Sequence, residues 1–193
     1  VLTLSREENM MTGEVTSEQK RIELPQMTEP VKAIFIETPT NPLLGVTDLE
    51  RVIGAAKAAG LLVIVDNTFM TSYLQKPLDF GADLVVYSAT KYYAGHSDIL
   101  AGLVVTNSEA LYPRIKLAHK LLGAILSPFD SFLLSRGIKT LPLRMERQEE
   151  NAHALAQYLE TKEGVEVFYT GLDSHPGHQL QNKQARGHSG VFS

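Results

Sequence analysis

Short apolar runs alternate with longer amphipathic segments between residues 31 and 193. Four of these runs have the length and the β-branched composition of buried strands. They span residues 33–37, 61–66, 81–88 and 99–106. Because runs without alternation are typical of strands covered on both faces, the pattern predicts a mainly parallel sheet.

Three segments with helical spacing of apolar residues accompany these runs. The first, DLERVIGAAKAAG, follows Thr47, which can cap a helix, and closes on Gly60, a typical stop. Two more helices are predicted at about 109–122 and 129–159, the latter with a break near Gly137 or Pro142. Strands that alternate with helices indicate an α/β fold in which helices flank the sheet.

Residues 1–30 have a different character from the rest of the chain. They are mostly polar, show no sustained period and close on Pro30. We therefore predict an irregular N-terminal segment over 1–30, followed by regular structure from residue 31.

Composition excludes several classes of function. With 193 residues and 44% hydrophobic content, the chain can build one full domain or one domain and part of another. A net charge of −4 argues against nucleic acid and anionic membranes as partners. There is no cysteine, and the longest apolar run is too short to span a bilayer. We expect a soluble, cytoplasmic protein.

Polar side chains follow three of the predicted strands at the points where these strands end. Ligands of open α/β sheets bind outside the carboxyl ends of the strands, so these side chains are the first candidates for a site. The set combines a carboxylate, amides, hydroxyls and an amine: Glu37, Thr38 and Asn41; Asp66, Asn67 and Thr68; Ser88, Thr90 and Lys91.

Lys91 most needs an explanation, because it closely follows a buried strand and an ammonium group is costly to bury without a partner or a chemical task. An amine held away from water is a nucleophile toward an aldehyde and forms a Schiff base. Pyridoxal phosphate, an aldehyde cofactor, also requires a carboxylate beside its ring nitrogen and donors for its phosphate. Asp66 meets the first requirement, and Ser88 and Thr90 meet the second.

Each of these residues also has a purely structural interpretation. A lysine after a strand can extend along the surface with its amine in water. Asp66 can be a turn or cap residue, and Ser88 and Thr90 can satisfy loop backbone groups.

Two further constellations suggest other chemistry. Residues 96–98, which read His-Ser-Asp, superficially suggest a hydrolase triad, but adjacent side chains point in different directions. His175, His178 and His188 suggest a metal site but lack a carboxylate framework and i,i+4 spacing. We interpret the three histidines as interdomain packing and turn residues, and we expect no metal.

Five motifs occur in order along the chain: ETPTNP, DNTFMT, SATKYYAGHSD, SPFDSFLLSRGIKTLPLRMERQEENA and GLDSHPGHQL. Together they resemble the Cys/Met-metabolism family of pyridoxal-phosphate enzymes, which includes cystathionine β-lyase, γ-lyase and γ-synthase. The resemblance covers residues 31–193. It implies pyridoxal 5'-phosphate as the cofactor and the aspartate-aminotransferase-like fold, known as fold type I. Residues 31–140 would be the cofactor-binding core of the large domain, and 141–193 a linking helix and the beginning of the C-terminal domain.

The resemblance also implies a role for each candidate residue. Lys91 would form the Schiff base, and Asp66 would pair with the pyridine nitrogen. Ser88 and Thr90 would bind the phosphate, and Asn41 would bond to the ring hydroxyl.

The implied activity is elimination or replacement at Cβ or Cγ of a sulfur amino acid, of the cystathionine β-lyase or γ-synthase type, by a homotetramer of two dimers. The alternative is a truncated, non-catalytic α/β module that acts only through partner contacts. Because residues 1–30 do not resemble the family and its substrate-clamping arginine is missing, we expect a fragment with little activity of its own.

Overall fold

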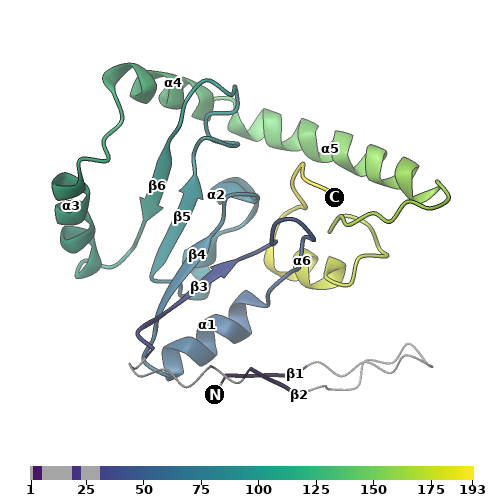
Figure 1. Cartoon of the computed structure of the whole chain (residues 1–193), viewed down its shortest axis with the longest axis horizontal. Helices are drawn as coiled ribbons and strands as arrows, with labels where there is room; N and C mark the ends of the chain where they lie inside the picture. The colour runs from purple at the N-terminus through teal and green to yellow at the C-terminus, as the bar shows by residue number, and fades with distance from the viewer. Residues whose placement is uncertain (1, 6–18, 23–30) are drawn as a thin grey trace.

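A computed structural model describes residues 2–5, 19–22 and 31–193. Its central feature is a four-stranded sheet in the order β3-β4-β5-β6 (Figure 1). The strands are β3 (Ala33–Glu37), β4 (Leu62–Asp66), β5 (Leu84–Ser88) and β6 (Gly102–Val105). The mainly parallel sheet is confirmed, because β3, β4 and β5 run parallel to one another.

The last strand differs from the prediction in direction and length. β6 pairs antiparallel with β5, with Ser88 opposite Gly102, and it covers only part of the run predicted at 99–106. The connection over 89–101 contains turns but no helix. Parallel neighbours require a long crossover, usually helical, so this short connection returns the chain in the opposite direction.

Burial also separates the inner strands from the outer ones. Val63, Val65 and Val85 on β4 and β5 are fully buried, as the apolar runs predicted. The prediction of burial is wrong for most of β3 and β6, where Phe35 is 61% exposed and Val104 is 54% exposed. These two strands form the edges of the sheet, and an edge strand has only one neighbouring strand to cover it.

The helical elements of residues 31–193 are α1 (Leu49–Ala58), α2 (Thr71–Leu74), a 3-10 turn η1 (Pro77–Phe80), α3 (Leu111–Leu122), α4 (Pro128–Ile138), α5 (Leu141–Glu160) and α6 (His178–Gln184). The three predicted helical segments are confirmed, and α2, η1 and α6 are additional helices that were not predicted. The break expected near Gly137 or Pro142 is confirmed as the junction between α4 and α5. The domain boundary expected at 140/141 coincides with the start of α5 and stays a prediction.

The ends of α1 confirm one prediction and correct another. Gly60 adopts a left-handed conformation just past the helix, with a φ of 72°, as expected for a stop. The N-cap is Asp48 and not Thr47, because the Asp48 side chain accepts a hydrogen bond from Arg51 N. Thr47 is engaged elsewhere, since its own N–H donates to Thr38 Oγ1 at 3.0 Å.

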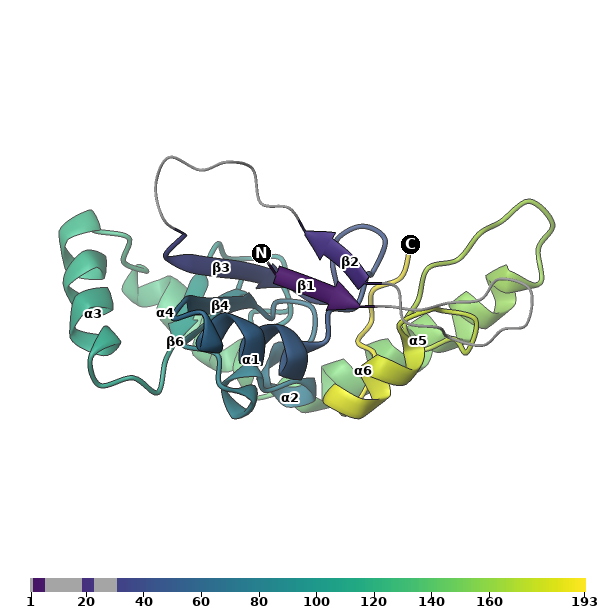
Figure 2. The same cartoon turned by 90° about the horizontal axis from the view of Figure 1, so that it is seen from below.

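Two apolar clusters hold the described part of the chain together. The larger one packs α1, the second half of α4 and the start of α5 against the sheet, with Leu49, Ile53 and Met145 at or below 1% exposure. The smaller one surrounds the fully buried Tyr169 near the C-terminus. Figure 2 shows α5 and α6 at one end of the molecule and α3 at the other.

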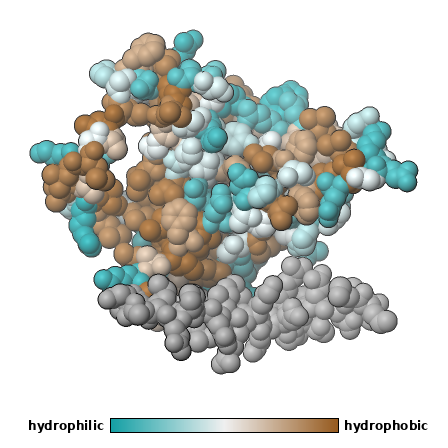
Figure 3. All heavy atoms as spheres, viewed as in Figure 1, coloured by the Kyte–Doolittle hydropathy of each residue, from teal (hydrophilic) through white to brown (hydrophobic). Residues whose placement is uncertain are grey.

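α3 stands apart from both clusters and has no buried residue. Figure 3 shows apolar side chains gathered over α3 and over the β6 side of the sheet. The exposed apolar residues of this region are Leu117, Leu121, Leu122, Ile125, Phe129 and Phe132. Among the helices of residues 31–193, none is long and apolar enough to cross a membrane.

The prediction of an irregular segment over 1–30 is wrong at two places. β1 (Leu2–Ser5) and β2 (Gln19–Ile22) form an antiparallel pair, with Leu2 opposite Ile22. Each strand has only four residues, which is too short for alternation to stand out from a polar background. The rest of the segment lies outside the described residues.

Replacing glycine by alanine should change the free energy of unfolding in opposite directions at two helical positions, Gly137 and Gly54. A Cβ at Gly137 would lie 2.3 Å from Ala94 O, whereas a Cβ at Gly54 would meet no atom within 4 Å. We expect Gly137→Ala to lower the free energy of unfolding by about 1–3 kcal/mol through overpacking. Gly54→Ala, the matched control in α1, should raise it by about 0.5–1 kcal/mol through helix propensity. Urea unfolding of both variants checks this, and a stabilised Gly137→Ala would contradict the close packing of α4.

Candidate active site

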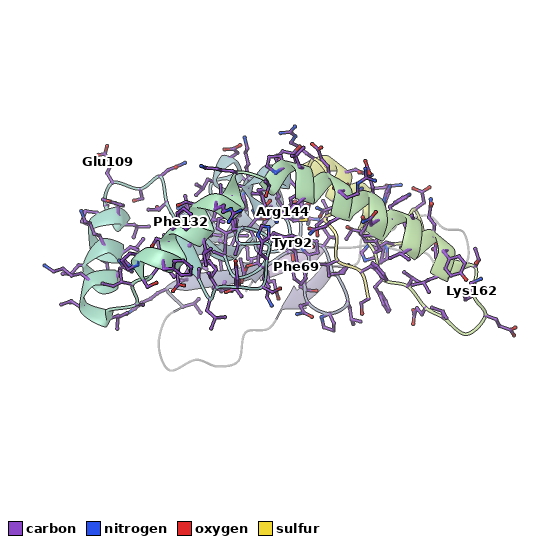
Figure 4. The ribbon with its side chains drawn as sticks, turned by 90° about the horizontal axis from the view of Figure 1, so that it is seen from above. Phe69, Tyr92, Glu109, Phe132, Arg144 and Lys162 are labelled. Carbon is purple, nitrogen blue, oxygen red and sulfur yellow. The ribbon has the colours of Figure 1, made fainter. Side chains whose placement is uncertain are left out.

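A cavity of about 770 Å³ opens next to the carboxyl end of β5. Its walls come from the loop after β3, the segment after β4, the loop after β5, the helix α5 and the C-terminal segment. The lining residues are Asn41, Phe69, Thr90, Lys91, Tyr92, Gly95, Ser97, Asp98, Ile99, Leu100, Gln148 and Val191. Figure 4 shows Phe69 and Tyr92 in the middle of the molecule, close to Arg144.

Lys91 lies on the wall of this cavity, in a tight turn that follows β5. Its N–H donates to Ser88 O at 3.1 Å, and its carbonyl accepts from Gly95 N at 2.8 Å. The expectation that this amine is held away from water is wrong, because the residue is exposed. The reason is its position beyond the end of the strand, at the open side of the cavity. Within residues 31–193 the amine forms no ion pair or hydrogen bond.

Asp66 and Ser88 end two neighbouring strands and are joined by a third residue, Thr68. Asp66 Oδ1 accepts from Thr68 N at 3.0 Å and from the Thr68 hydroxyl. Thr68 Oγ1 in turn accepts from Ser88 N at 2.8 Å. This bridge fixes the carboxylate of Asp66 relative to the start of the turn that carries Lys91. Neither Asp66 nor Ser88 lines the cavity itself.

Thr90 lines the cavity, but its hydroxyl has a local partner. Ala101 N donates to Thr90 Oγ1 at 2.9 Å, and the hydroxyl donates back to Ala101 O at 3.3 Å. These bonds tie the turn after β5 to the segment that leads into β6. The Thr90 hydroxyl therefore satisfies backbone groups of the loop, as the purely structural interpretation of this residue predicted.

Asn41 reaches the same cavity from the turn that follows β3. This turn is closed by hydrogen bonds of Thr40, whose hydroxyl accepts from Gly45 N and whose carbonyl accepts from Leu44 N. The structure thus brings Asn41, Thr90 and Lys91 to one cavity, although they follow two different strands.

A buried amide network behind the cavity was not predicted as a unit. Asn67 Nδ2 donates to Thr71 O at 3.0 Å and to Gln75 O at 2.8 Å. Gln75 Nε2 donates to Asn67 Oδ1 at 2.9 Å and to Thr38 O at 3.2 Å. The network joins the end of β4 to the end of β3. Its sequence signal is a polar residue, Asn67, directly after a buried strand.

The cavity-wall side chains that sequence reasoning missed include Phe69, Tyr92 and Gln148. Phe69 and Tyr92 each lie within a motif that was noted, next to residues that were chosen. Burial raises the pKa of Tyr92, whose hydroxyl lies 3.5 Å from Ser189 Oγ. Gln148 comes from α5, and no local pattern links it to strand ends far away in the sequence.

The histidines take part in local contacts. The rings of His178 and His188 stack with centroids 5.2 Å apart, and His175 Nδ1 accepts from Gly177 N. In the described ranges no group of three or more His, Cys, Asp or Glu residues is arranged to hold a metal ion. His96 Nδ1 lies 2.7 Å from Ala94 O, a bond within its own turn.

Comparison with known proteins reveals close relatives. The model of a family described as Cys/Met metabolism PLP-dependent enzyme matches residues 8–193, so the expectation that residues 1–30 do not resemble the family is wrong from residue 8 onward. The chain is 52% identical over 166 residues to a cystathionine beta-lyase of Lactococcus lactis, covering 86% of this chain and 44% of that protein. It is 52% identical over 163 residues to a cystathionine gamma-lyase of Bacillus subtilis, covering 84% and 43%. The chain thus spans less than half the length of these relatives.

A solved structure shows the same similarity in three dimensions. The cystathionine gamma synthase from Xanthomonas oryzae pv. oryzae, in complex with cystathionine, superimposes with a TM-score of 0.82 at 48% identity. The match covers 83% of this chain and 42% of that one. The expected fold type is therefore confirmed.

The Thr68 bridge yields a prediction about stability. Thr68→Val keeps the shape of the side chain but leaves Ser88 N without its acceptor, so we expect the free energy of unfolding to fall by about 1–3 kcal/mol. Thr161→Val, which removes an exposed hydroxyl bond to Tyr158 O, is the control and should change it by less than about 0.5 kcal/mol. Urea unfolding measures both. If both substitutions lower the free energy of unfolding equally, the Thr68 bridge stabilises the fold no more than an exposed hydroxyl bond does.

His188 yields a prediction about pH. Its burial, together with the nearby His178, His153 and His175, lowers its pKa from 6.5 to about 4. Between these pH values the unfolded chain binds a proton that the folded chain does not, so the free energy of unfolding falls as pH falls through this window. Below about 4 both states are protonated and the dependence ends.

The measurement is urea unfolding at several pH values between 7 and 4. In His188→Asn the free energy of unfolding should depend less steeply on pH, and the difference in slope should correspond to at most one bound proton. His119→Asn, on the exposed surface of α3, is the matched control. An unchanged slope in His188→Asn would contradict the lowered pKa of His188.

Proposed function

The chain belongs to the Cys/Met metabolism family of pyridoxal-phosphate-dependent enzymes, and on this premise we propose that it forms the cofactor-binding core of an enzyme that eliminates or replaces a substituent at Cβ or Cγ of a sulfur amino acid. We assign it to the cystathionine β-lyase or γ-synthase type. The observation that carries the proposal is that Lys91 shares one cavity wall with Asn41 and Thr90. The cystathionine enzymes among its relatives support the choice of substrate class.

The residues present fit pyridoxal phosphate. The cavity volume of about 770 Å³ lies within the range of about 300–1,000 Å³ that small-molecule sites occupy. The Lys91 amine has no partner within residues 31–193 and is exposed on the cavity wall, so it is accessible to an aldehyde. Asp66 does not line the cavity but ends the strand next to β5, and Thr68 fixes its Oδ1. We propose that its Oδ2 is the atom that pairs with a ring nitrogen.

When bound, the cofactor supplies an aldehyde for attachment and an electron-withdrawing ring. Lys91 has two tasks in the proposed mechanism. Its neutral amine is the attachment point, and after the substrate amine has taken its place it removes the proton from Cα of the substrate. The same amine, now protonated, can return the proton.

The other residues bind and orient. We assign the Asp66 carboxylate to the protonated ring nitrogen and the Asn41 amide to the ring hydroxyl. Ser88 and Thr90 are assigned to the phosphate, with charge-assisted hydrogen bonds. Thr90 must then give up its hydroxyl bond to Ala101 O, although it can keep the bond that it accepts from Ala101 N.

We further propose that the protein works as a homo-oligomer, a tetramer made of two dimers. The exposed apolar side chains of α3 and of the region before α4 support this, because large exposed apolar patches are typical of interfaces.

Covalent labelling tests the proposed function. Incubation with pyridoxal phosphate, reduction with borohydride and peptide mapping should place a pyridoxyl group on Lys91. Exposed Lys76 and Lys116 should carry only background label, and Lys91→Ala should lose the specific label. Equal labelling of all three lysines would refute the assignment and favour the alternative of a non-catalytic module.

A further inference from the structure

The guanidinium group of Arg144 joins two segments that are far apart in the sequence. Arg144 Nη1 donates to Tyr92 O at 2.7 Å, and Nη2 donates to Gly137 O at 2.9 Å and reaches Tyr93 O at 3.5 Å. Arg144 Nε donates to Thr140 Oγ1 at 3.0 Å. Two acceptors thus belong to the turn that carries Lys91, and two belong to the junction of α4 and α5.

Two glycines make room for this arrangement. Gly95 has a φ of +76°, and a Cβ there would lie 2.1 Å from Arg144 Nη1. Gly137 allows the backbone of α4 to approach Ala94 O, where a Cβ would lie at 2.3 Å. The guanidinium group therefore fills a space that a side chain at Gly95 would occupy, and a side chain at Gly137 would separate α4 from the turn. Burial lowers the pKa of Arg144, which shows that the group is partly removed from water.

The position of Arg144 relative to Lys91 suggests what the contact does. Arg144 holds the carbonyl of Tyr92, the residue directly after Lys91, but does not itself line the cavity. The Lys91 carbonyl is held by Gly95 N at the other end of the turn. Two successive carbonyls, those of Lys91 and Tyr92, are thus held by hydrogen bonds, and the second bond comes from a residue outside the cavity wall.

We propose that Arg144 is a positioning residue, which holds the turn 91–95 so that the Lys91 amine is directed into the cavity. The inference rests on the proposed function of Lys91. Arg144 donates to two carbonyls of the turn and to two acceptors at the α4–α5 junction. It ties the turn to that junction in a way that a single ammonium cannot, because guanidinium donors lie in a fixed fork. A reacting amine must be held near its attack geometry, and misplacement far from the chemistry reduces rate strongly.

A purely structural role predicts a different result from a positioning role. If Arg144 only linked α4 to α5, its loss would lower overall stability without a specific effect on the turn. Met145, the next residue, is fully buried in the main core, so Met145→Ala destabilises the same helix while leaving the guanidinium contacts in place. Arg147 is exposed on α5 and pairs with Glu150, so Arg147→Met controls for the loss of an arginine charge.

The first measurement is hydrogen–deuterium exchange of the full chain. The amides of Ala94 and Gly95 donate to Ala89 O and Lys91 O within the turn. In Arg144→Met we expect peptides covering residues 89–97 to exchange about tenfold faster than in the unmodified chain, the change expected for the loss of a charge-assisted hydrogen bond. Arg147→Met should leave them unchanged. If Met145→Ala accelerates them as much as Arg144→Met does, the positioning role is overturned.

The second measurement is the rate of borohydride-trapped labelling by pyridoxal phosphate. Labelling of Lys91 should fall about tenfold in Arg144→Met, while background labelling of Lys76 stays constant. Arg144→Lys should restore the rate only in part, because an ammonium group cannot span both segments.

The two measurements distinguish a failure of the positioning role of Arg144 from a failure of the proposed function of Lys91. If Lys91 of the unmodified chain takes no specific label, the proposed function fails, and the exchange data alone decide whether Arg144 holds the turn. If Lys91 is labelled at the same rate in the unmodified chain and in Arg144→Met, the positioning role is overturned and the proposed function stands.

Discussion

The buried amide of Asn67 must be hydrogen-bonded on all sides, and the arrangement of the strand ends follows from this requirement. Its backbone N–H donates to Val86 O on the neighbouring strand, and its carbonyl accepts from Thr71 N. Its side-chain Nδ2 donates to Thr71 O and to the backbone carbonyl of Gln75, and its Oδ1 accepts from Gln75 Nε2. With Asn67 fixed in this way, Asp66 and Thr68 on either side have little freedom, and Thr68 then reaches Ser88 N.

Local patterns predicted most of the fold, because the forces that shape its elements act over short distances. The apolar run at 33–37 matches β3 residue for residue, and the break between α4 and α5 was expected from Gly137 and Pro142. The direction of β6 was not predictable from its own sequence, because it depends on the shape of the connection before it. The exposure of Lys91 was missed for a similar reason, since a strand pattern does not reveal where the chain leaves the sheet.

The candidate site divides into residues that line the cavity and residues that hold them from behind. Sequence reasoning found members of the first group, such as Lys91 and Asn41, because their chemistry is unusual at the end of a strand. It found fewer members of the second group. Arg144 lies on a helix among other charged residues, and only its bonds to Tyr92 and Gly137 distinguish it from a surface arginine. Such contacts bring together segments that no local window contains.

Gly95 and Arg144 compete for the same space, and Gly137 packs against the turn that contains Gly95, so the residues acceptable at each position depend on the others. A side chain at Gly95 would collide with the guanidinium group, and one at Gly137 would push the turn away from it. Substitutions at sites in direct contact do not combine additively. A side chain at Gly95 therefore fits this space only after Arg144 has been replaced by a smaller residue, so the order in which the two mutations occur decides whether each is tolerated.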